Sequence, residues 1–380
     1  MMEFINKLDI PTPCYVIDEE KLVDNAKKLA EVHKRTGATV LLALKAFSMY
    51  SVFPLIRDYL AGITASSLNE ARLGYEEFRE QVHVYSPGIQ EHEFAELMKY
   101  SDHFVFNSFS QWLKFKDQLS ASSKKIECGL RLNPEYAEIK TDLYNPCIKN
   151  SRLGITLKEF KPEFMDGISG FHFHALCEQS AEVLERVLAH FEAKFAPYLN
   201  KVKWVNFGGG HHITKPDYNL DLLCNLITNF KNRYQLEEII IEPGEALALN
   251  AGYLVTEVVD LVHNDFDIAI LNTSAACHMP DVLEMPYKPE ILGAAEPNIL
   301  AHTYRLGGVS CLAKDIVGDY SFEEPLKIGQ KLIFTDMAHY TMVKTTFFNG
   351  VQLPHTGLIT KDKKFKLIKS FSYEDFKSKL

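Results

Sequence analysis

The sequence predicts a (β/α)8 barrel of the TIM type followed by a mostly antiparallel β domain. Short apolar or β-branched runs alternate with helical patterns up to about residue 250, and beyond that point strand-like runs follow one another without helices. The length of 380 residues suits two domains at roughly 150 residues each. We expect residues 22–250 to form the barrel and residues 251–380 to form the β domain, with residues 1–21 joining the latter.

The predicted barrel strands are short and separated by amphipathic segments. Residues 180–195 place Val183, Val187 and Phe191 on one face of a helix, and residues 69–78 form a similar stretch. A barrel of this type needs eight parallel strands with helices between them, whereas an open doubly wound sheet usually has fewer. The runs are residues 40–45, 62–66, 82–87, 103–107, 126–133, 168–174, 202–208 and 239–244.

The C-terminal part has a different pattern of predicted elements. Glycine and proline interrupt strand-like runs at 253–263, 266–273, 304–309 and 331–334. Such punctuation without intervening helices is typical of an antiparallel sheet. The lysine-rich stretch 361–369 alternates with apolar residues and indicates a terminal strand or helix.

Composition speaks against several classes of protein. The net charge of −9 disfavours nucleic-acid binding and favours cationic ligands. The N-terminus lacks the pattern of a signal peptide, and no apolar window reaches the ~20 residues of a membrane span. The seven scattered cysteines contain no C-x-x-C pair, which disfavours a disulfide framework or a zinc site. We therefore expect a reduced, cytoplasmic protein without a bound metal, nucleic acid or membrane partner.

Polar residues stand at the carboxyl ends of the predicted barrel strands, where barrel enzymes build their active sites. Lys45 ends the first run, His174 the sixth, the glycines at 208–210 the seventh and Glu242 the eighth. Each alone has a simpler explanation, such as a surface lysine, a buried histidine, a tight turn or a polar strand exit. Their joint placement favours one shared site.

These residue types together suit one cofactor, pyridoxal 5′-phosphate. A lysine between apolar neighbours can have a lowered pKa and form a Schiff base with an aldehyde. Consecutive glycine amides can hold a phosphate, and a carboxylate can keep a pyridine nitrogen protonated. The ring of a histidine can stack on the pyridine. The sequence therefore predicts a pyridoxal-phosphate enzyme.

The chain resembles the fold type III pyridoxal-phosphate decarboxylases, the group of ornithine and diaminopimelate decarboxylases, from residues 12–16 to residues 336–341. Within that group it is most similar to the carboxynorspermidine and carboxyspermidine decarboxylases, through residues 44–48, 278–287 and 307–315. The resemblance implies a carboxy-lyase of polyamine biosynthesis that gives norspermidine or spermidine. It also implies a small cationic substrate and a homodimer with shared active sites.

The resemblance implies a role for each matched residue. Lys45 would carry the cofactor, His174 would stack on its ring, and Glu242 would face its nitrogen. Cys311 would return a proton to the substrate across the dimer interface, where Arg152 would meet Asp315. The phosphate ligands would be Gly209, Gly210, Gly244 and Tyr340. The acidic lining for the substrate amines would be Glu245, Asp281, Glu284 and Asp315.

Two departures from the family pattern bear on the site. After His174 the relatives usually have a Gly-Ser pair that touches phosphate, and this chain has Ala175 and Leu176, so another group must replace that contact. Where many relatives carry arginine after a Glu-Pro-Gly turn, this chain has Glu245, which would attract an amine or be a solvated loop charge. Asp281 and Glu284 could bind a substrate amine or cap a turn.

Other functions remain open at this point. His172 and His174 form a His-x-His pattern that could bind a metal in an amidohydrolase, although such enzymes place the pair on the first strand, where this chain has Lys45. Of the adjacent His211 and His212, we expect one to line the site and the other to lie at the surface. Further alternatives are a diaminopimelate or other basic amino-acid decarboxylase of the same fold and a non-catalytic regulatory homologue.

Overall fold

The computed structural model describes residues 2–380, which divide into two compact units. Asp24–Leu247 form one unit, and the segment up to Val23 joins Ala248–Leu380 in the other. The N-terminal segment belongs there because β1 (Cys14–Asp18) pairs with both β10 (Gly252–His263) and β16 (His355–Ile359). Within residues 2–380 no helix combines the length and the apolar character that a membrane span requires.

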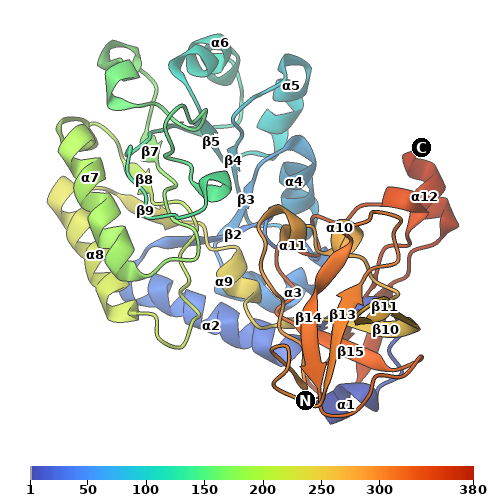
Figure 1. Cartoon of the computed structure of the whole chain (residues 1–380). Helices are drawn as coiled ribbons and strands as arrows, with labels where there is room; N and C mark the ends of the chain where they lie inside the picture. Colours follow the sequence, from blue (N-terminus) through green and yellow to red (C-terminus); the bar gives the residue numbers. More distant parts are fainter. Residues whose placement is uncertain (1) are drawn as a thin grey trace. The chain divides into compact units, whose positions relative to one another are not determined.

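A closed barrel of parallel strands forms the unit of residues 24–247 (Figure 1). The last strand returns to the first, with Thr39 opposite Ile240. Strands of such a barrel are covered on both faces, and accordingly every residue of the first strand is buried. The predicted fold class is confirmed. The strands are β2 (Thr39–Ala43), β3 (Gly62–Ala65), β4 (Gln81–Tyr85), β5 (His103–Phe106), β6 (Glu127–Arg131), β7 (Gly170–His172), β8 (Trp204–Asn206) and β9 (Glu238–Ile241).

Helices cover the outside of this barrel (Figure 1). The helix expected at 180–195 is present, and Val187 and Phe191 lie on its buried stripe as predicted. Val183 is only half-buried, and Leu184 is the buried residue in its place. The helix expected at 69–78 is α-helical only to Leu73 and continues to Phe78 as a π-helical turn. The helices are α2 (Glu19–Thr36), α3 (Phe53–Ile56), α4 (Leu68–Leu73), α5 (Glu91–Tyr100), α6 (Phe109–Ser120), α7 (Ala181–Leu199), α8 (Leu220–Tyr234) and α9 (Glu245–Ala248).

The inward face of the barrel changes from apolar to polar along the strands. Trp204 and Ile240 belong to one buried apolar cluster. Gly129 and Gly170 on the neighbouring strands make room for the indole, because a Cβ atom at Gly170 would lie 2.0 Å from it. Side chains on one face of a strand recur every second residue. The next inward residues toward the carboxyl ends are therefore Arg131, His172, Asn206 and Glu242, which we call the polar layer.

The second unit contains a nine-stranded sheet. Its strand pairs are antiparallel except β1 with β16 and β11 with β13, which confirms the predicted mostly antiparallel domain. The lysine-rich stretch near the C-terminus forms its last strand. The remaining strands are β11 (Asp267–Leu271), β12 (Ala294–Ala295), β13 (His302–Gly307), β14 (Ile316–Phe322), β15 (Lys331–Thr335) and β17 (Phe365–Lys369). The helices of this unit are α1 (Met2–Asn6), α10 (Ala275–His278), α11 (Asp281–Glu284) and α12 (Tyr373–Lys379).

Candidate active site

Lys45 lies just after β2, at the carboxyl end of the barrel. Its side chain is accessible to solvent. The surrounding barrel residues nevertheless displace water from the ammonium group, and this desolvation lowers its pKa, with Glu242 and Glu70 opposing the shift. A lysine with a lowered pKa is more often the neutral amine that attacks an aldehyde. The residue therefore has the properties of a Schiff-base lysine.

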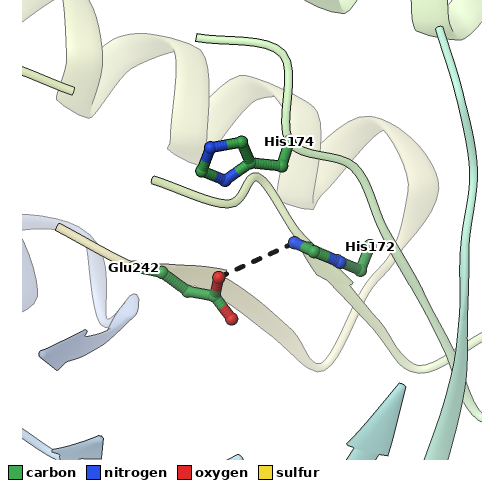
Figure 2. A group of neighbouring side chains, drawn as sticks. All are labelled: His172, His174 and Glu242. Carbon is green, nitrogen blue, oxygen red and sulfur yellow. Dashed lines mark ion pairs between the residues drawn. The ribbon is translucent and has the colours of Figure 1, made fainter. Parts of the chain in front are cut away.

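Glu242 directly follows β9 and is buried. Its Oε1 atom accepts a hydrogen bond of 2.8 Å from Asn206 Nδ2, and its Oε2 atom lies 3.7 Å from His172 Nε2 (Figure 2). Burial raises the pKa of the Glu242 carboxyl, while Asn206 and Lys45 lower it. A buried acid of this kind gains most from a cationic partner, such as a protonated ring nitrogen.

The two histidines of the His-x-His pattern differ in their contacts. His174 is half-buried, and its Nδ1 atom accepts a 3.0 Å hydrogen bond from the Gly209 amide. His172 is buried, and neither of its ring nitrogens has a hydrogen-bond partner. Burial lowers the pKa of both imidazoles. One potential ligand atom from each histidine and from Glu242 lies within 4.8 Å of the others, an arrangement that could also hold a metal ion (Figure 2).

The glycines allow the loops after β8 and β9 to approach closely. A Cβ atom at Gly209 would lie 2.4 Å from the carbonyl oxygen of Glu242, and one at Gly244 would lie 2.7 Å from the Cβ atom of Ala46. Gly210 has φ = +84°, which favours glycine. Because the Gly209 amide already bonds to His174, a phosphate contact there would have to replace that bond.

Arg131 and Asn206 of the polar layer, together with Tyr85 of β4, are site residues that the sequence did not single out. The guanidinium carbon of Arg131 lies 4.6 Å from the centre of the Tyr85 ring. The Tyr85 hydroxyl donates a 2.8 Å hydrogen bond to Asn107. Arg131 and Asn206 both lie inside predicted strand runs, near their carboxyl ends, so the same strand-end argument could have found them.

Glu245 begins α9 and contacts a histidine. His212 Nε2 lies 3.1 Å from Glu245 Oε1, and the Glu178 carboxylate belongs to the same group within 4.8 Å. This contact does not fit the interpretation of Glu245 as a solvated loop charge. His211 and His212 are both buried, so the expectation that one of them lies at the surface is wrong. The reason is that the backbone of Gln179 pairs with this segment. The Gln179 amide donates to the Gly210 carbonyl, and the Gln179 carbonyl accepts from the His212 amide.

Cys311 and Asp315 lie in the second unit. Cys311 is exposed, and its amide donates a 2.8 Å hydrogen bond to Asn349 Oδ1. Asp315 is buried and accepts hydrogen bonds from the amide of Ala276 and from the hydroxyls of Ser274 and Ser310. These bonds favour a structural role in which Asp315 joins two loops. The expected contacts of Asp315 with substrate and with Arg152 stay predictions.

Asp281 and Glu284, at the two ends of α11, share a cation. Lys344 Nζ pairs with Asp281 and lies 3.2 Å from Glu284 Oε2. Although partial burial lowers it, the pKa of Lys344 is raised overall by the two carboxylates. The pair thus already binds one ammonium group within the chain. Tyr340 has φ = +42°, and its phosphate contact stays a prediction.

Comparisons with known proteins match nearly the whole chain. The family model described as "Pyridoxal-dependent decarboxylase, C-terminal sheet domain" matches residues 14–338. Carboxyaminopropylagmatine decarboxylase of Synechocystis sp. is 43% identical over 98% of this chain and 96% of the relative. Carboxynorspermidine/carboxyspermidine decarboxylase of Campylobacter jejuni is 43% identical over 97% of this chain and 98% of the relative.

A solved structure agrees with both the fold and the family. The crystal structure of carboxynorspermidine decarboxylase from Campylobacter jejuni, complexed with norspermidine, matches with a TM-score of 0.91 and 42% identity. The match covers 98% of this chain and 100% of the solved one. Neither the amidohydrolase nor the non-catalytic interpretation is supported by these matches. The chain belongs to the pyridoxal-dependent decarboxylases, a family of carboxy-lyases.

Proposed function

We propose that the protein removes CO₂ from carboxynorspermidine or carboxyspermidine with pyridoxal 5′-phosphate and so forms norspermidine or spermidine. The observation that carries the proposal is the pairing, in one barrel, of an accessible lysine of lowered pKa with a buried glutamate. The substrates are proposed from the relatives that share nearly the whole chain. Its seven cysteines are all free, which suits the cytoplasm.

The residues of the barrel fit this cofactor. The unpartnered nitrogens of buried His172 are groups that a bound polar molecule can satisfy. Lys45 would bind the aldehyde, Glu242 would hold the ring nitrogen, and His174 would lie against the ring. The proposed phosphate ligands are Gly209, Gly210, Gly244 and Tyr340. When bound, the cofactor supplies an electron sink for the carbon that loses CO₂.

The remaining residues manage protons and charge. Glu242 must be ionised to hold a ring nitrogen protonated, and the bond from Asn206 favours that state. Cys311 would act as the general acid that returns a proton to the substrate carbon of the partner's site. The exposure of Cys311 fits such a role. The proposed working enzyme is the homodimer with shared sites that the family resemblance implies.

Acidic groups would bind the substrate amines. Glu245 is a half-buried carboxylate beside His212, and Asp281 and Glu284 already hold the Lys344 ammonium group. Partly buried charge-assisted bonds contribute about 1–3 kcal/mol each. Glu245 also stands where diaminopimelate decarboxylases use a cation, so a distal carboxylate would be repelled.

A second substrate is favoured by a specific finding. The carboxyaminopropylagmatine decarboxylase of Synechocystis sp. is as similar to this chain as the Campylobacter jejuni enzyme. Its substrate ends in a guanidinium group in place of an ammonium group. Both ends are cations, so the same acidic groups could bind either one.

The test combines a spectrum with a substrate panel. The purified protein should show an absorption band at ~420 nm that is lost in Lys45→Ala, because the lysine amine forms the covalent link. It should decarboxylate carboxynorspermidine, carboxyspermidine or carboxyaminopropylagmatine far faster than meso-diaminopimelate, ornithine or arginine. A protein that cannot be loaded with pyridoxal phosphate but holds stoichiometric zinc would overturn the cofactor, and a preference for meso-diaminopimelate would overturn the substrate class.

A further inference from the structure

His172 is a buried histidine to which the proposed function assigns no specific partner. It is 1% exposed, and both of its ring nitrogens lack hydrogen-bond partners. A buried polar group without a partner is destabilising, so its contacts are expected to form when the site is filled. The acid nearest to it is Glu242, at 3.7 Å between Nε2 and Oε2 (Figure 2).

The carboxylate of Glu242 is flanked by two inward side chains of the polar layer. Asn206 of β8 donates to Oε1 at 2.8 Å. His172 of β7 faces Oε2, and moving it from 3.7 Å to hydrogen-bond distance requires only about 0.8 Å. Strand β8, which neighbours β9, and strand β7 beyond it thus offer one donor to each oxygen of the same carboxylate.

The charges around His172 determine which atom holds the proton. Burial first, and then Arg131 and Lys45, lower its pKa, so the imidazole is neutral and carries one N–H group. An ionised carboxylate can only accept, so a bond to Glu242 requires the proton on Nε2. Arg131 and Lys45 favour the ionised form of Glu242 as well. Tyr85 also faces His172, with ring centres 5.5 Å apart.

We propose that His172 is a positioning residue whose Nε2–H group donates to Glu242 and, with Asn206, holds that carboxylate ionised and directed at the ring nitrogen of pyridoxal phosphate. The proposal rests on the proposed cofactor and extends it to a residue two positions before the stacking histidine. The donor acts through Glu242, so its loss should change cofactor binding and leave the substrate KM nearly unchanged.

The experiment compares His172→Phe, which fills the space without a donor, with His172→Gln, which keeps an N–H donor. The dissociation constant of pyridoxal phosphate is measured by absorption titration from pH 5.5 to 8.5. His172→Phe should bind the cofactor about 10- to 100-fold more weakly, the range for one hydrogen bond to a charged group. Since a lost donor raises the pKa of Glu242, its binding should also begin to fail at a higher pH as the solution is acidified. His172→Gln should restore most of both properties.

His103→Gln provides the matched control, because His103 is an inward histidine of β5 beside Trp204 and far along the strand from the polar layer. It should bind the cofactor like the wild type. Wild-type affinity and pH dependence in His172→Phe would overturn the proposal, and so would a His172→Gln variant as weak as His172→Phe. A wild-type protein that takes up no pyridoxal phosphate would instead overturn the proposed function itself.

Discussion

The polar layer of the barrel and the polar cluster around Asp315 differ in how their hydrogen bonds are satisfied. In the barrel, His172 lacks partners and Glu242 is buried with a raised pKa. In the second unit, Asp315 accepts hydrogen bonds from Ser274 and Ser310. Lys344 forms ion pairs with Asp281 and Glu284 in the same unit. Unsatisfied buried groups indicate where a ligand belongs, and satisfied ones indicate a scaffold. The polar layer of the barrel therefore has unsatisfied groups that a ligand could contact, whereas the bonds of Asp315 hold loops of the second unit together.

The largest expected effect tests whether the exposed Cys311 serves a different subunit from Lys45. Cys311→Ala should lower kcat by about 10²- to 10⁴-fold, the usual range for a lost general acid. Mixing it with inactive Lys45→Ala should restore about one quarter of wild-type activity, because half of the randomly formed dimers contain one intact site. Activity is measured after subunit exchange has been shown with tagged chains. A mixture that exchanges and stays inactive contradicts shared sites.

Lowering the pH should destabilise the barrel more than the second unit. Among the described residues, burial lowers the pKa of five barrel histidines, His83, His103, His172, His174 and His211, and of one histidine in the second unit, His278. Each has a lower pKa folded than unfolded, so the unfolded chain binds protons first. Stability is then lost as the pH falls below about 6.5, at up to about 1.4 kcal/mol per pH unit for each such group.

Urea unfolding at pH 7.5, 6.5 and 5.5 measures this dependence. The raised pKa values of Glu242 and Glu70 act in the opposite direction, since the folded chain binds those protons first, but they are two groups against five. His103→Gln removes one of the five histidines, so the urea midpoint of this variant should fall less steeply with pH than that of the wild type. A midpoint that stays constant over this pH range would contradict the prediction.

Charge reversal at Glu245 tests the acidic site of the barrel unit. Glu245→Arg should raise KM for a carboxylated polyamine by about tenfold or more, with a smaller change in kcat, because a cation would replace an attractive carboxylate. Glu245→Gln keeps the shape of the side chain and removes its charge, so its KM should lie between those of the wild type and Glu245→Arg. Equal KM values for all three proteins would show that Glu245 does not face the substrate.

The smallest expected effect concerns the acidic pair of the second unit. Lys344→Met frees Asp281 and Glu284 from their internal cation. If these carboxylates bind a substrate amine, KM should fall by up to about fivefold, the range for a partly exposed ion pair. Lys344→Arg keeps the charge and should leave KM unchanged. An unchanged KM in Lys344→Met would assign the pair to the support of α11 alone.

Sequence patterns predicted the barrel well because its strands and its site follow one rule. Parallel strands bring their carboxyl ends together, so Lys45, His174 and Glu242 could be placed in one barrel from their positions in the runs. Arg131 and Asn206 obey the same rule but lack a distinctive chemistry, and they were missed. The burial of His211 and His212 depends on Gln179, which lies more than 30 residues away and carries no signal of that pairing.

The second unit was harder to predict because its contacts connect distant parts of the chain. β1 pairs with β16 near the other end of the sequence, and neither strand was predicted. The bonds of Asp315 to Ser274 likewise span two loops that no periodicity relates. Asp315 lies in a segment that resembles a family motif, which indicated a functional role. Its hydrogen bonds in the fold favour a structural role instead.

The indole that fills the barrel beneath the polar layer has an optical consequence. The chain has two tryptophans, Trp112 and Trp204, and both belong to the unit of residues 24–247. Intrinsic tryptophan emission therefore reports on the barrel alone, and the second unit is silent at that wavelength. Trp204 lies two residues before Asn206, so an aromatic chromophore bound at the strand ends would quench its light by resonance energy transfer. Loading of the site and melting of the barrel can thus be followed without attaching a dye.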